Sequence, residues 1–147
     1  GDLPMIMCYP GQLNQVFMNI ISNAIDALNQ QSIQGIQPVF SDSSSQKNTL
    51  KNYDKQQIEI QTQIINEGSI LVQITDNGPG IFDHVREKLF DPFFTTKPIG
   101  KGTGLGLSVS YQIIVEHHRG KLWCESVPGQ GTTFSIQIPI NQSVLSS

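Results

Sequence analysis

Apolar side chains recur at every third or fourth position over residues 12–28, which is the spacing of one face of an amphipathic helix. Pro10 and Gly11 precede this stretch and predict where the helix starts. A second helix is predicted over residues 105–115, where apolar residues occupy most faces, and Gly120 is expected to end it. The pattern therefore predicts one helix with a single apolar face and a later helix that is buried on several sides.

Apolar and polar residues alternate in further stretches, as they do in strands. Residues 58–64 and 70–74 alternate on either side of a turn at 66–69, which predicts an antiparallel hairpin. Residues 121–125 and 132–138 flank a Pro128-Gly129 turn and predict two more strands. Helices and strands in this order predict an α+β fold in which helices pack on a sheet.

The stretch 30–57 lacks periodicity and is rich in Ser, Gln, Asn and Lys. Structureless loops longer than about 15 residues are uncommon in compact domains. We therefore expect this polar insertion to be disordered or to fold only with a partner. The remaining residues suffice for one core, so residues 1–147 are treated as a single domain.

Composition narrows the classes of partner. The net charge is −3, charged residues make up 14%, and no basic run occurs, which disfavours nucleic acid as a partner. No apolar stretch approaches the ~20 residues that span a bilayer, which predicts a soluble domain without direct membrane contact. Cys8 and Cys124 show neither Cys-x-x-Cys nor paired-His spacing, so a reducing, cytoplasmic location is expected.

Polar residues on the first helix recur at intervals of four, four and three and share one stripe, namely Gln15, Asn19, Asn23 and Asp26. Carboxamide and carboxylate oxygens suit Mg²⁺, which takes its other ligands from water and from substrate phosphates. The alternative is an ordinary solvated helix face.

A second chemical signal is the motif D-N-G-P-G at residues 76–80, directly after the hairpin. Asp76 has the same parity as Ile74, so its carboxylate is predicted to point into the core, where it needs a donor. The exocyclic amine of adenine would serve, and Gly78 and Gly80 would let the backbone approach the base. Thr132 falls on the inward-facing positions of the last predicted strand and is expected near the same pocket. A plain turn and a packing threonine are the alternatives.

A third signal is the glycine-rich stretch 100–108, which leads into the second helix. Backbone amides at a helix N-terminus attract anions, and glycines let phosphates come close. The stretch matches neither the dinucleotide-binding fingerprint nor the P-loop. Lys97 and Lys101 lie nearby and can reach phosphates, unless they are simply solvated.

In this order and spacing the motifs resemble those of the GHKL ATPase/kinase superfamily, and within it the catalytic domain of two-component sensor histidine kinases. Residues 19–24 resemble the N box, 76–80 the G1 box, 90–94 the F box, 102–108 the G2 box and 129–132 the closing glycine motif. The resemblance implies the Bergerat-type two-layer α/β sandwich, with a mixed, mostly antiparallel sheet on about three helices. It also implies an ATP lid over residues 90–104.

The resemblance further implies ATP and Mg²⁺ as cofactors. Asn23 would coordinate Mg²⁺, with Asn19 as a further candidate ligand and both as catalytic residues, while Asp76 would recognise adenine. The remaining nucleotide contacts are expected from Ala27, Gly78, Gly80, Ile81, Lys97, Lys101, Gly102, Thr103, Gly104, Leu105, Gly106, Leu107 and Thr132.

Two positions depart from patterns found in the superfamily. Asn19 stands where the ATPases carry a water-activating glutamate, and an amide cannot accept the proton, so slow hydrolysis is expected. Asp26 stands where many members carry a lysine, so the phosphate contacts are expected from the lid or from the glycine-rich amides.

The function that the resemblance implies is transfer of the γ-phosphoryl group of Mg·ATP to a histidine on the dimerisation domain of the same kinase, which then serves a response regulator. None of His84, His117 and His118 stands in the His-Glu or His-Asp context of an acceptor, and the start at Gly1 favours a fragment. We therefore expect the acceptor domain outside this sequence. The alternatives are a protein serine kinase of the anti-sigma-factor type and an ATP-sensing interaction module without catalysis.

Overall fold

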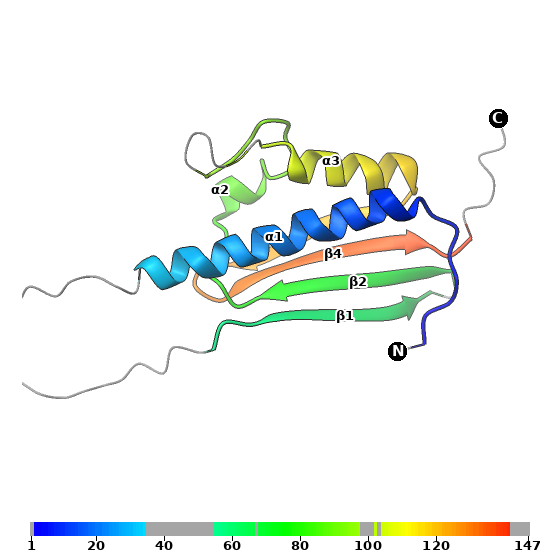
Figure 1. The fold of residues 1–147 in the computed structure, drawn as a ribbon, viewed down its shortest axis with the longest axis horizontal. Helices are drawn as coiled ribbons and strands as arrows, with labels where there is room; N and C mark the ends of the chain where they lie inside the picture. The colour runs from blue at the N-terminus through cyan, green and yellow to red at the C-terminus, as the bar shows by residue number, and fades with distance from the viewer. Residues whose placement is uncertain (1, 35–54, 67, 98–101, 103, 142–147) are drawn as a thin grey trace, which may run out of the picture.

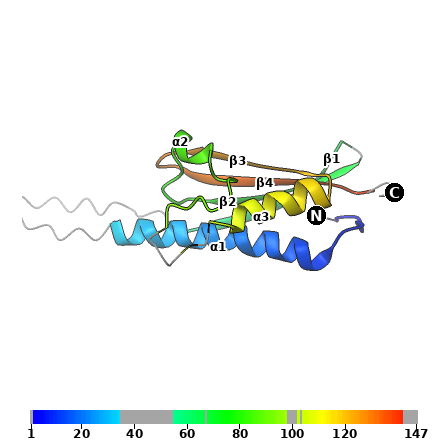
Figure 2. The ribbon, with the colours of Figure 1, turned by 90° about the horizontal axis from the view of Figure 1, so that it is seen from above.

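The computed structural model describes residues 2–34, 55–66, 68–97, 102 and 104–141. They form two layers, a sheet and a layer of helices that covers one of its faces (Figures 1 and 2). The long helix α1 (Pro10–Gln34) and the shorter α3 (Gly106–Gln112) run beside each other over the sheet. The predicted α+β sandwich is confirmed.

The sheet is four-stranded, in the order β1-β2-β4-β3. Its strands are β1 (Ile58–Ile65), β2 (Ser69–Asp76), β3 (Lys121–Val127) and β4 (Gly131–Pro139). All neighbouring pairs in this described sheet are antiparallel, which confirms the antiparallel character of the prediction; no parallel pair of the expected mixed sheet occurs among the described strands. The register pairs Asp76 with Ile58 on one side and with Thr132 on the other, so the end of β2 lies in the middle of the sheet.

The core lies between the two layers. Helix α1 buries its predicted apolar face, including Val16 and Ile20, against Ile74 of β2 and Ile136 of β4. Removing one such side chain from water contributes about 1.5–3 kcal/mol. Because side chains alternate along a strand, the parity that buries Ile74 also turns Asp76 toward the helices.

Helix α1 is longer than predicted, since it continues past Leu28 to Gln34. The chain returning to β1 supports the extra turns: Gln56 Nε2 donates to the carbonyl oxygen of Leu28 over 2.7 Å and also bonds the hydroxyl of Ser32. The expected insertion therefore begins later than residue 30, and residues 55–57 already lead into the sheet. Residues 35–54 lie outside the described part of the chain, so the expectation of disorder is not tested there.

The second predicted helix ends in a π-helical turn, η1 (Ile113–His117), directly after α3. The backbone N–H of His118 donates to the Ile113 carbonyl over 3.1 Å, a five-residue spacing instead of the usual four. This wider turn goes together with the complete burial of His118.

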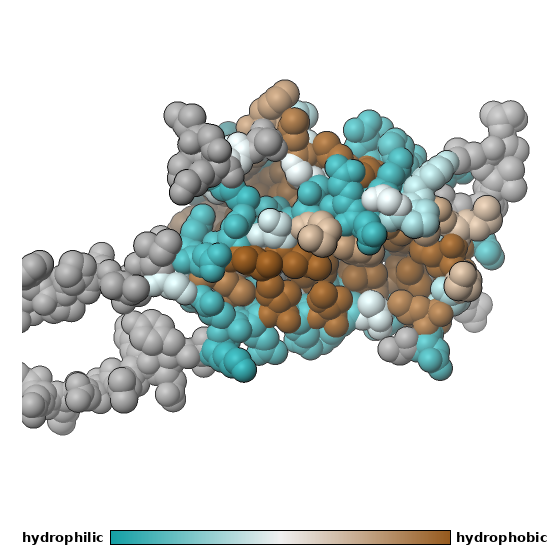
Figure 3. Space-filling view, in the orientation of Figure 1, coloured by the Kyte–Doolittle hydropathy of each residue, from teal (hydrophilic) through white to brown (hydrophobic). Residues whose placement is uncertain are grey.

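Strand β1 reaches beyond the cover of the helices. Ile60 and Ile64 of β1 and Met18 and Ile25 of α1 are exposed, and Figure 3 shows an apolar band between these two elements.

Within the described residues, no helix combines the length and apolar character needed to cross a membrane.

Candidate functional site

A cleft of about 610 Å³ opens between helix α1, the loop after β2 and the segment that leads into α3. It brings together most of the residues singled out from the sequence. The predicted residues that line it are Asn19, Asn23, Ala27, Asp76, Gly80, Ile81, Lys97, Gly102, Gly104, Gly106, Leu107 and Thr132. Three motifs that are far apart in sequence therefore meet at one cavity.

Other predicted residues behave differently. Gly78 and Leu105 do not belong to the cleft lining: Gly78 donates its N–H to Asp76, and the Leu105 carbonyl accepts from the Val109 N–H at the start of α3. Lys101 and Thr103 lie outside the described residues, so their places are not known. Gln15, part of the predicted polar stripe, is exposed and does not line the cleft.

Asp76 is a buried carboxylate, only 4% exposed, in the wall of the cleft. Its Oδ1 accepts the Gly78 N–H over 2.9 Å. Burial raises the pKa of this carboxyl above its ordinary value, and the Gly78 hydrogen bond offsets part of the increase. A Cβ on Gly78 would lie 2.8 Å from the same oxygen, so a larger residue here would displace the Asp76 carboxylate.

Thr132 lies directly opposite Asp76 on β4 and is 5% exposed. Its hydroxyl lies 2.9 Å from the Ser126 hydroxyl. Ser126 donates to the Gly131 carbonyl over 2.8 Å and accepts the Ile81 N–H over 2.8 Å, so its one hydrogen is already used. Thr132 must then be the donor toward Ser126. The bond from Ile81 to Ser126 ties the loop after β2 to the β3–β4 hairpin.

Asn19 joins helix α1 to the start of α3. Its Nδ2 lies 3.0 Å from the Gly106 carbonyl oxygen and 3.2 Å from the Ser110 hydroxyl. Because a carbonyl only accepts, the atom facing Gly106 must be the amide nitrogen. The Oδ1 of Asn19 is therefore the atom left for a ligand, beside Asn23, which lines the same cleft.

The segment before the glycine-rich stretch forms the other wall. Phe94 lines the cleft, whereas Phe93 is 74% exposed. Phe93 adopts a φ of 65°, and Gly104, with a φ of 69°, lies against its backbone so closely that no Cβ fits. This contact fixes where the segment turns back toward α3.

Two features that build the cleft were missed by the sequence analysis. The short helix α2 (Asp83–Arg86) and its flanks supply Phe82, Val85 and Leu89, and Ser126 braces the site from β3. Apolar residues at 81, 85 and 89 gave a weak helical signal, but the helix has only four residues. Ser126 lay just beyond the predicted end of its strand.

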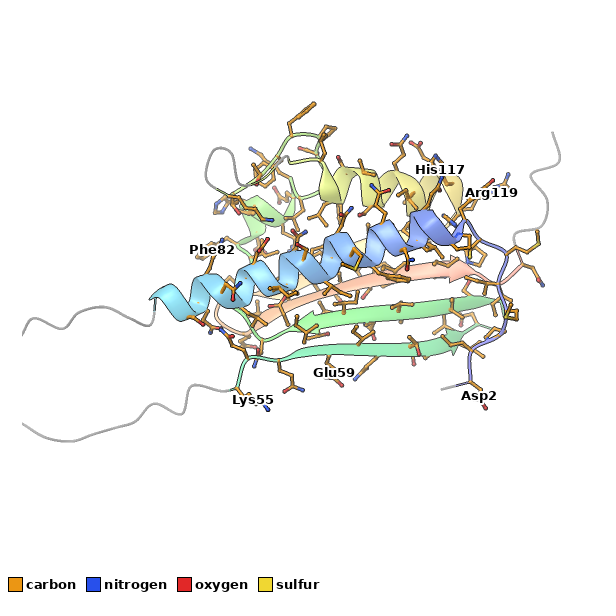
Figure 4. All side chains as sticks on the ribbon, viewed as in Figure 1. Asp2, Lys55, Glu59, Phe82, His117 and Arg119 are labelled. Atoms are coloured by element: carbon orange, nitrogen blue, oxygen red, sulfur yellow. The ribbon has the colours of Figure 1, made fainter. Side chains whose placement is uncertain are left out.

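The histidines do not line this cleft. His118 is buried, with Nδ1 2.8 Å from the Ile113 carbonyl and Nε2 accepting the Tyr9 N–H over 3.0 Å, so both ring nitrogens bond within the protein and the residue is structural. His117 Nδ1 lies 2.9 Å from Gln12 Oε1. Figure 4 shows His117 at the opposite end of the molecule from Phe82, a residue of the cleft.

The thiol of Cys124 does not offer a second reactive centre. Burial, only partly offset by Arg86, raises the pKa of Cys124 to about 12, so its thiol stays neutral. No group of three or more His, Cys, Asp or Glu side chains that could hold a metal ion occurs among the residues with described positions. The hard oxygen donors at the cleft include the amides of Asn19 and Asn23 and the carboxylates of Asp26 and Asp76.

Comparison with known proteins places these features in a family. The sequence profile described as Histidine kinase-, DNA gyrase B-, and HSP90-like ATPase matches residues 8–142. Sporulation kinase E of Bacillus subtilis is 35% identical over 97% of this chain and 16% of its own length. The histidine-protein kinase AtoS of Escherichia coli is 38% identical over 88% of this chain and 17% of its own length.

A solved structure supports the same placement. The catalytic domain of histidine kinase ThkA, in a nucleotide-free form, is 30% identical with a TM-score of 0.66, and the match covers 92% of this chain and 71% of that one. The chain spans 16% and 17% of the two kinases named above, so it corresponds to one part of such proteins. The chain belongs to the family of histidine kinase-, DNA gyrase B- and HSP90-like ATPases, so it is an ATP-binding domain, and its curated relatives are histidine kinases.

Proposed function

We propose that this domain binds Mg·ATP in the cleft and presents the γ-phosphoryl group to a histidine on the dimerisation domain of the same kinase. The observation that carries the proposal is the buried Asp76 carboxylate in the cleft wall, to which only the Gly78 amide donates among the described residues. A buried anionic acceptor favours a ligand that brings a donor. The exocyclic amine of adenine is such a donor.

The opposite side of the cleft suits phosphates and a cation. The Oδ1 of Asn19 and the side chain of Asn23 are hard oxygen donors of the kind that Mg²⁺ takes in small number, alongside water and phosphate. We assign Asn23 as the principal ligand and Asn19 as the second candidate. Bound Mg²⁺ would neutralise phosphate charge, while the Gly106 end of α3 and Lys97 would orient the phosphates.

The amide at position 19 disfavours hydrolysis, so the γ-phosphoryl group stays available for a protein nucleophile. An amide cannot take a proton from water. A histidine nitrogen instead attacks the γ-phosphorus, the bond to the β,γ-bridging oxygen breaks, and ADP leaves with that oxygen. The domain supplies position and charge, so the acceptor and the response regulator belong to other parts of the signalling system.

Incubation with γ-labelled ATP and the separately produced dimerisation domain tests the proposal. We expect label on the histidine of that domain, and phosphate release to water far below ~1 s⁻¹, a modest turnover for an enzyme. Steady hydrolysis without transfer would place the chain with the water-activating ATPases. Binding without either reaction would favour the ATP-sensing module, and label on a serine would favour the serine-kinase alternative.

A further inference from the structure

An ion pair joins the two walls of the cleft. Lys97 Nζ lies 2.5 Å from Asp26 Oδ2, and both residues line the cleft. Asp26 belongs to helix α1, whereas Lys97 is the last residue of the described stretch 68–97. The side chain of Lys97 is 28% exposed and that of Asp26 is 41% exposed, so the pair is partly screened by solvent.

Local contacts direct Lys97 toward Asp26. The Thr95 hydroxyl accepts the Lys97 N–H over 3.1 Å, which fixes the backbone at this point. A Cβ on Gly102 would approach the Lys97 Cδ to 3.0 Å and its Cβ to 3.1 Å. The aliphatic stem of Lys97 therefore lies against the bare Cα of Gly102, and its ammonium extends to helix α1.

The charge balance of the cleft makes this pair consequential. Lys97 is the only basic residue among the described lining residues, whereas Asp26 and Asp76 are acidic. Nucleotide phosphates need positive charge, and the one described ammonium already has an anionic partner. A phosphate oxygen that contacts the Lys97 ammonium must therefore displace the Asp26 carboxylate or share the ammonium with it.

We propose that Asp26 is a specificity-determining residue, which holds Lys97 in the empty cleft and so sets how strongly phosphate-bearing nucleotides bind. The inference rests on the proposed binding of Mg·ATP in this cleft. A partly exposed ion pair is weak, and nucleotide phosphates carry more charge than one carboxylate, so the exchange favours the nucleotide. Asp26 thus lowers the affinity for ATP without preventing its binding.

The test compares wild type with Asp26→Asn in calorimetric titrations with Mg·ATP and with adenosine. We expect Asp26→Asn to bind Mg·ATP about twofold to fivefold more tightly, the range set by a partly exposed pair, with adenosine affinity unchanged. Asp26→Glu keeps the charge and should stay near wild type. Glu116→Gln, an exposed site outside the cleft, removes the same net charge and should change neither affinity.

Hydrogen exchange across residues 94–97 gives an independent measurement on the nucleotide-free domain. Asp26→Asn should exchange faster there than wild type, and ATP should remove the difference. Unchanged or weaker Mg·ATP binding by Asp26→Asn, or an equal shift for adenosine, overturns the inference. If wild type itself binds no ATP, the proposed function fails; if wild type binds and only the Asp26 effect is missing, the inference alone fails.

Discussion

Asp76 and Thr132 are directly paired across strands β2 and β4, and both buried side chains face the same cleft. The pairing places an anionic acceptor and a hydroxyl side by side on the sheet face that packs against the helices. Ser126 holds the Thr132 hydroxyl, so the pair is braced by neighbouring strands and not by a flexible loop.

Asp76 should make the stability of the empty domain depend on pH. Its pKa is raised in the folded state because burial disfavours the charged form. The contribution of Asp76 to folding stability is therefore complete below the ordinary carboxyl pKa near ~4. It is lost as the pH rises through the raised pKa of the folded state. Asp76→Asn should be more stable than wild type at neutral pH, with a gain that shrinks toward pH 4. Denaturant titrations from pH 4 to 8 measure this, and a difference that is constant with pH would contradict it.

Asn19 should contribute to stability as well as to ligand binding. Asn19→Ala removes the donor that faces the Gly106 carbonyl and the Ser110 hydroxyl, and we expect a loss of about 1–3 kcal/mol in unfolding free energy. Gln15→Ala, an exposed change on the same helix, is the control and should shift stability by less than ~0.5 kcal/mol. Equal losses in the two variants would show that the Asn19 bonds do not join the helices.

Gly104 should be more sensitive to substitution than Gly129, although both have positive φ, 69° and 83°. A Cβ at Gly104 meets the backbone of Phe93, whereas at Gly129 it meets nothing within 4 Å. Gly129→Ala should cost only the backbone strain of about 1–2 kcal/mol and keep ATP affinity. Gly104→Ala should displace the segment 94–97 and weaken ATP binding at least tenfold, measured by calorimetry. Similar affinities in both variants would exclude this role for the Gly104–Phe93 contact.

The insertion should be dispensable for nucleotide binding. Gln56 bonds the Leu28 carbonyl and the Ser32 hydroxyl, so the two ends of the stretch 35–54 are held near each other without it. Replacing residues 35–54 by a short Gly-Ser linker should leave ATP affinity within about twofold. A folded deletion variant that lost ATP binding would show that the insertion belongs to the site.

Strand parity predicted the most informative part of the site, because a period of two assigns a face to every residue. It placed Asp76 and Thr132 inward, and both are buried. Features that depend on contacts distant in sequence were missed: the extension of α1 needs Gln56, and the role of Ser126 needs the hairpin register. The ion pair between Asp26 and Lys97 likewise joins segments that no local pattern connects.

Calorimetric titration of wild type and Asp76→Asn with Mg·ATP and Mg·ITP measures whether Asp76 recognises the adenine amine of bound ATP. Inosine carries an oxygen in place of the adenine amine, so wild type should bind ATP at least about tenfold more tightly than ITP, as for one charge-assisted hydrogen bond. Asp76→Asn should fold, lose detectable ATP binding and lose the preference over ITP. Wild-type affinity for ATP in a folded Asp76→Asn, or equal wild-type affinity for ATP and ITP, would contradict the account.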